Sequence, residues 1–133
     1  MEAIRGSQKS LILVARQLGV HIGANDIPER FKIDDRELSL KEMCELARSF
    51  DLKAKATKVN ENELLKLLAK KQQILKLKNG RYIIALRAIA NEDEKSILCL
   101  DAGISNPKPQ QISLKELLKG WDGSVILLKA KLK

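Results

Sequence analysis

The sequence has too few cysteines and histidines for most metal centres and disulfide scaffolds. Its 133 residues include two cysteines, Cys44 and Cys99, and one histidine, His21. We therefore expect a reducing, cytoplasmic setting, no metal and no cofactor. The longest unbroken aliphatic run, 11–15, is far shorter than the roughly 20 residues that cross a membrane, and the first residues lack a secretion signal. We expect no membrane span in this segment.

Aromatic residues are also scarce, whereas basic residues are in excess. Of the four aromatic side chains, Phe31 and Phe50 belong to apolar helix faces, so no platform for stacking bases is visible. Residues 1–52 carry 8 Lys and Arg against 9 Asp and Glu, but residues 53–133 carry 17 against 8. This surplus attracts nucleic acid, anionic lipid or acidic polypeptide, although it also serves solubility alone.

The hydrophobic pattern predicts one α+β domain over 1–133, with helices first and an antiparallel sheet after them. Helices are predicted at 8–18, 25–31, 39–50, 60–68 and 113–120, and strands at 52–59, 74–77, 82–89, 96–101 and 125–128. Ser39 with Glu42, and Ser113 with Glu116, have capping-box spacing, and Asn79-Gly80 is typical of a two-residue hairpin. Segments 33–37, 91–94 and 105–109 are predicted as loops or turns.

Several segments, in this order, resemble the peptidase domain at the N-terminus of bacterial ABC exporters. They are 11–19, 25–27, 30–31, 38–52, 79–82, 100–101, 106–107 and 123–128. This is the bacteriocin-processing cysteine peptidase type (peptidase family C-thirty-nine), and its degenerate form in type I secretion exporters of RTX haemolysin toxins is the most similar. The resemblance implies a papain-like cysteine peptidase fold and the N-terminal cytoplasmic domain of a longer ABC transporter.

The resemblance also implies that catalysis is lost. An active member needs a cysteine at the head of the first helix, a histidine on the sheet, an aspartate that orients it and an upstream glutamine. The three triad positions fall at Gly6, Tyr82 and Asp101, and the glutamine would lie at or before Met1. Haemolysin-type relatives usually lose the cysteine and keep the histidine, whereas this chain has lost both.

In such exporters the degenerate domain is thought to hold unfolded, acidic RTX-type substrate near the transporter, on the cytoplasmic side of the bacterial inner membrane. The other partners implied are the transmembrane and nucleotide-binding domains of the exporter. We expect basic side chains to steer the substrate, the densest run being Lys66, Lys70, Lys71, Lys76, Lys78 and Arg81. We expect Tyr82 and Asp101 to supply a specific contact, and Leu77 stands where relatives carry a tryptophan.

Two other functions stay open on the residues alone. A polyanion- or nucleic-acid-binding module is favoured by charge but opposed by the scarcity of aromatics, so no nucleic acid is expected. A thiol peptidase that uses Cys44 or Cys99 is the least supported hypothesis, because a small buried thiol explains each cysteine more simply. Trp121 is expected to pack in the core rather than to contact a ligand.

Overall fold

A computed structural model of the chain describes residues 6–23, 26, 38–90, 95–101 and 108–130. Within them the predicted helices and strands are present in the predicted order, with one additional strand. The helices are α1 (Gly6–Gln17), α2 (Leu40–Ser49), α3 (Glu61–Leu68) and α4 (Leu114–Gly120). The strands are β1 (Leu52–Lys58), β2 (Gln73–Leu77), β3 (Tyr82–Ala90), β4 (Lys95–Leu100), β5 (Gln110–Ser113) and β6 (Trp121–Ala130). The elements expected at 25–31, 33–37, 91–94 and 105–107 lie outside the described residues.

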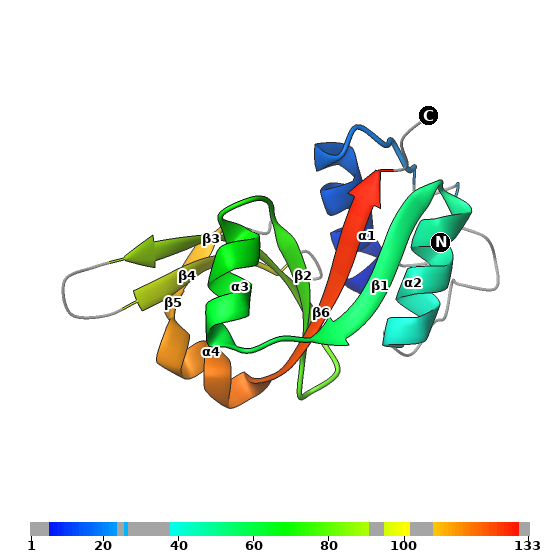
Figure 1. The fold of residues 1–133 in the computed structure, drawn as a ribbon. Helices are drawn as coiled ribbons and strands as arrows, with labels where there is room; N and C mark the ends of the chain where they lie inside the picture. Colours follow the sequence, from blue (N-terminus) through cyan, green and yellow to red (C-terminus); the bar gives the residue numbers. More distant parts are fainter. Residues whose placement is uncertain (1–5, 24–25, 27–37, 91–94, 102–107, 131–133) are drawn as a thin grey trace.

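The six strands form one sheet in the order β1-β6-β2-β3-β4-β5, and each neighbouring pair is antiparallel (Figure 1). The last strand, β6, lies between β1 and β2. Its pairing with β1 runs from Leu52 opposite Ala130 to Lys58 opposite Ser124. Two details differ from the prediction: β6 begins at Trp121 rather than at residue 125, and the short edge strand β5 was not predicted.

Two glycines permit backbone conformations that other residues rarely adopt. Gly80 has a φ of +89° in the hairpin between β2 and β3, where its N–H donates to the Leu77 carbonyl at 2.9 Å. Gly123, inside β6, has a φ of +95°. A Cβ on Gly123 would lie 3.0 Å from the carbonyl oxygen of Val59, whose N–H donates to the Gly123 carbonyl at 2.9 Å. A side chain at this position would therefore disturb the pairing of β6 with the end of β1.

Local side-chain hydrogen bonds fix where the helices begin. The predicted capping box of α2 is confirmed, since Ser39 accepts from the Glu42 N–H at 3.1 Å and Glu42 accepts from the Ser39 N–H at 3.0 Å. Asn60 and Glu63 form the same reciprocal pair at the start of α3. At α4 only half of the predicted capping box forms: the Ser113 hydroxyl accepts from the N–H of Glu116 at 3.1 Å, whereas the Glu116 carboxylate pairs with Lys119 at 3.4 Å.

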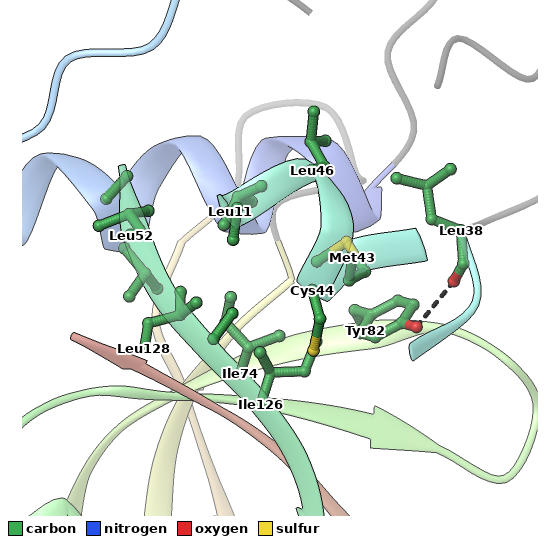
Figure 2. Close-up of a cluster of buried hydrophobic side chains, with 14 of the residues drawn as sticks. Leu11, Leu38, Met43, Cys44, Leu46, Leu52, Ile74, Tyr82, Ile126 and Leu128 are labelled. Carbon is green, nitrogen blue, oxygen red and sulfur yellow. Dashed lines mark hydrogen bonds between the residues drawn. The ribbon is translucent and has the colours of Figure 1, made fainter. Parts of the chain in front are cut away.

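Strand alternation divides the core between the two faces of the sheet. On one face, α1 and α2 pack on side chains such as Ile74, Tyr82 and Ile126, and we call this core cluster 1 (Figures 1 and 2). On the other face, α3 and α4 pack on side chains such as Leu75 and Ile83, which form cluster 2. Residues that follow one another along β3 therefore serve different cores. No described helix is long and apolar enough to cross a membrane.

Candidate functional site

Tyr82, the residue at the expected histidine position, is the first residue of β3 and faces cluster 1. Its side chain is 1% exposed, beside Met43 and Cys44 of α2 (Figure 2). Its hydroxyl donates to the Leu38 carbonyl at 2.7 Å. The aromatic face expected for substrate contact is therefore not presented to solvent, because the ring packs between α2 and the sheet. Lys76, opposite Tyr82 on β2, places its ammonium 5.9 Å from the ring centroid.

Gly6, at the expected cysteine position, is the first residue of α1. A reactive cysteine is favoured at the N-terminus of a helix, where the backbone amides lower the pKa of a thiol. Neither thiol of the chain has that setting. Cys44 is on α2 and Cys99 on β4, at 5% and 7% exposure. Burial raises the pKa of Cys44, and burial raises the pKa of Cys99 to about 12, so both thiols favour their protonated form.

Asp101, the third expected triad position, follows β4 and pairs with Arg81 of the β2–β3 hairpin. The guanidinium Nη2 and the carboxylate Oδ2 are 2.5 Å apart, with the two side chains 50% and 26% exposed. Solvent screens such a pair, so it contributes little stability. It does link the hairpin to the end of β4, and it holds the carboxylate on the cluster 2 side of the sheet.

A cavity of about 240 Å³ lies beside this ion pair, where α4 packs on β4 and β5. Leu77, Asp101 and Cys99 are among the residues that line it, so two of the predicted site residues meet here. The other lining residues are Ile83, Lys108, Gln110, Ile112, Glu116, Leu117 and Gly120. Apolar side chains form most of the wall, which suits one apolar side chain of a bound peptide. The contribution of β5 was missed because that strand was not predicted.

The basic run 66–81 does not form one patch. Lys70 and Lys71 precede β2, whereas Lys78 and Arg81 follow it. Five strand residues separate the two ends by roughly 16 Å. Lys70 and Lys71 line a second cavity, of about 340 Å³, next to the C-terminal part of α1. The Lys71 ammonium donates to the Leu128 carbonyl of β6, and its pKa is lowered, first by burial and then by the nearby Lys129.

The remaining chemical candidates have simple structural roles. Trp121 is 4% exposed and donates from Nε1 to the Ser124 carbonyl at 2.8 Å, which confirms its predicted place in the core. His21 is exposed and lies after α1. Among the described residues, no group of three or more His, Cys, Asp and Glu side chains could hold a metal ion.

The sequence from residue 9 to residue 133 matches the Peptidase C39 family. The chain belongs to this family. The match begins within α1 and includes all of the later helices and strands, so the fold described above is that of a C39 domain. No curated protein matches the chain in a sequence search.

Solved structures of C39 domains have the same fold. One is the N-terminal peptidase C39-like domain of a toxin secretion ATP-binding protein from Vibrio parahaemolyticus, with 22% identity, 97% of this chain and 99% of that chain covered, and a TM-score of 0.75. Another is the peptidase domain of Streptococcus ComA, a bifunctional ABC transporter, with 17% identity, coverage of 96% and 93%, and a TM-score of 0.78. A third is a double-glycine-motif protease of an AMS/PCAT transporter in complex with the leader peptide, with 15% identity, coverage of 98% and 88%, and a TM-score of 0.70.

Proposed function

We propose that this C39 domain is catalytically inactive and binds an unfolded, acidic RTX-type secretion substrate. In this proposal it is the N-terminal domain of an ATP-driven ABC exporter and holds the substrate on the cytoplasmic side of the inner membrane, near the transporter. The named neighbours include a toxin secretion protein and a transporter protease in complex with a leader peptide, which supports an exporter parent and a peptide ligand.

The observation that carries the inactivity is the state of the thiols. The chain has only Cys44 and Cys99, and both are buried with a raised pKa. A cysteine peptidase needs a thiolate within reach of a histidine. The histidine position is filled by Tyr82, whose hydroxyl is bonded to a backbone carbonyl. The nucleophile and its base are thus both replaced by groups that cannot perform acyl transfer at neutral pH.

The cavity beside Leu77 and Asp101 and the basic surplus support the binding part of the proposal. An unfolded chain offers isolated apolar side chains, and the cavity has room for one. Acidic segments of the same chain are attracted by the lysines of residues 53–133, over about one Debye length of roughly 8 Å. Lys70 and Lys71 at one end of β2, and Lys78 and Arg81 at the other, would steer such a chain from two sides.

An NMR titration of the isotope-labelled chain tests the binding. The ligand is an acidic, glycine-rich RTX-repeat polypeptide, unfolded without calcium and folded with it. We expect shifts around Leu77, Ile112 and the lysines in calcium-free buffer, and their loss when calcium folds the repeats. No shifts in either state would refute the binding role.

Mass spectrometry of the same mixtures tests the inactivity. We expect the polypeptide to stay intact during prolonged incubation with the domain. Cleavage that is abolished by alkylation of Cys44 and Cys99 would show an active thiol peptidase and refute the proposed loss of catalysis. A nucleic-acid role has less support, since Tyr82 and Trp121 are both buried and offer no surface for base stacking.

A further inference from the structure

The face of β1 and β6 that is turned away from α2 carries a group of lysines that the sequence does not reveal. Lys53 of β1 stands directly opposite Lys129 of β6, and Lys55 lies two residues further along the same face of β1. All three side chains are exposed. Leu127, the cross-strand partner of Lys55, is half-buried between them and supplies an apolar floor for the lysine stems. The lysines are therefore brought together by the pairing of strands that are distant in sequence.

Lys71 adds a fourth ammonium to this group. It comes from the segment between α3 and β2 and reaches β6, where it donates to the carbonyl of Leu128. Its neighbour there is Lys129, whose charge lowers the pKa of Lys71 in addition to the effect of burial. The anchor on the β6 backbone holds this ammonium close to Lys129. We call Lys53, Lys55, Lys71 and Lys129 the lysine face.

The lysine face is electrostatically unbalanced. None of its four members makes an ion pair in the part of the chain that the structure describes, where the pairs are Arg81–Asp101 and Lys119–Glu116. Like charges directly opposite on an antiparallel pair are destabilising, and the Lys53–Lys129 pair is of this kind. An anionic ligand would remove that repulsion and gain several close ion pairs at once.

The ligand would lie on the face rather than extend the sheet. β1 is an edge strand, but Arg48 of α2 already donates to its Ala54 carbonyl at 2.8 Å. This bond from α2 satisfies a backbone carbonyl that an added strand would need, which is a common way to protect an edge strand.

We propose that the lysine face binds an acidic segment of extended polypeptide, which gives the unfolded substrate of the proposed function a second contact besides the cavity. Lys53 and Lys55 are about 7 Å apart along the strand, the spacing of alternate side chains in an extended chain. The four ammoniums come from only two neighbouring strands and one turn, so they lie close enough together for a few carboxylates of a single peptide to contact them. The described residues expose one large hydrophobic side chain, Leu118 on α4, so this face has no apolar group to insert into a lipid surface.

The test compares two double variants of equal charge change in binding to one acidic peptide. The peptide has aspartate at alternate positions among glycines, is unfolded without calcium, and has an asparagine version as its neutral counterpart. The first variant, Lys53→Gln with Lys129→Gln, removes the opposed pair. The control, Lys41→Gln with Lys115→Gln, removes two exposed lysines from α2 and α4. We expect the first variant to bind the acidic peptide about threefold to thirtyfold more weakly at low salt, and the control to stay within about twofold of the unaltered chain.

The outcomes separate this inference from the proposed function. Equal weakening by both variants, or no weakening by the first, would overturn the lysine face while leaving substrate binding intact. An unaltered chain that binds neither peptide would refute the proposed function itself. Lysine-dependent binding of phosphatidylserine vesicles or duplex DNA, without peptide binding, would also overturn the inference. The first variant should unfold at the same or a higher urea concentration, because it loses a like-charge pair, so weak binding would not reflect misfolding.

Discussion

Replacing Tyr82 with phenylalanine separates a structural role of this residue from a role in binding. The substitution keeps the ring, which is 1% exposed in cluster 1, and removes the hydroxyl that donates to the Leu38 carbonyl at 2.7 Å. The carbonyl loses that donor inside the protein. Loss of a buried hydrogen bond costs about 1–2 kcal/mol, so we expect the free energy of unfolding of Tyr82→Phe to fall by that amount. For a chain of this size the melting temperature should fall by roughly 3–8 °C.

Urea denaturation followed by circular dichroism measures the change, and titration with the calcium-free acidic polypeptide measures affinity on the same samples. We expect lower stability, an unchanged dependence on urea concentration and unchanged affinity. The opposite result, unchanged stability with clearly weaker binding, would show that the hydroxyl of Tyr82 reaches the ligand. That result would refute the placement of this side chain in the core.

Three further experiments test other parts of the structure. Burial raises the pKa of Cys99 from 9.0 to about 12, so the protonated thiol contributes fully to the free energy of unfolding below pH 9, and this contribution is lost as the pH rises toward 12. At pH 10 the free energy of unfolding should be lower by roughly 1.4 kcal/mol. Urea titrations should show a weaker pH dependence for Cys99→Val. Gly123→Ala should destabilise by about 1–3 kcal/mol, whereas Gly120→Ala, with open space around its Cβ, should not; differential scanning calorimetry compares the two. Asp101→Asn breaks the exposed pair with Arg81 and should change the free energy of unfolding by less than about 1 kcal/mol in urea titrations.

Elements with strong local signals could be predicted from the sequence. The capping box of Ser39 and Glu42 depends on residues three positions apart and forms as predicted. The hairpin turn also lies at Asn79-Gly80, but it is longer than the predicted two residues, because Leu77 pairs with Arg81 and leaves residues 78–80 in the turn. The start of β6 was predicted too late because Trp121-Asp122-Gly123 has the composition of a turn. Gly123 instead allows a positive φ within β6, at the point where this strand pairs with the end of β1. Tertiary packing decides such a position, and no local pattern reveals it.

The candidate site was harder to predict, for a similar reason. The place of Leu77 and Asp101 in one cavity depends on α4 and the short strand β5, which pack against the end of the hairpin. Tyr82 combines a polar group with a large ring, so its type alone did not distinguish a binding residue from a core residue. Its alternation with Ile83 along β3 carried the missing information, since one faces cluster 1 and the other faces cluster 2. Predicting the lysine face would require the register between two strands that are more than 60 residues apart in sequence.

The position of β6 between β1 and β2 has a consequence for the order in which the domain can fold. This strand is the last element of the described chain, yet it joins β1 on one side to β2 on the other. Until it is synthesised, β1 and the helix α2 that packs on it lack their main connection to the hairpin β2–β3, whereas α1 packs on β2 and β3 directly. Contacts between residues so distant in sequence form slowly, because a long loop must close before they bring any gain. We therefore expect the nascent chain to stay incompletely folded on the ribosome until its final strand has emerged from the exit tunnel.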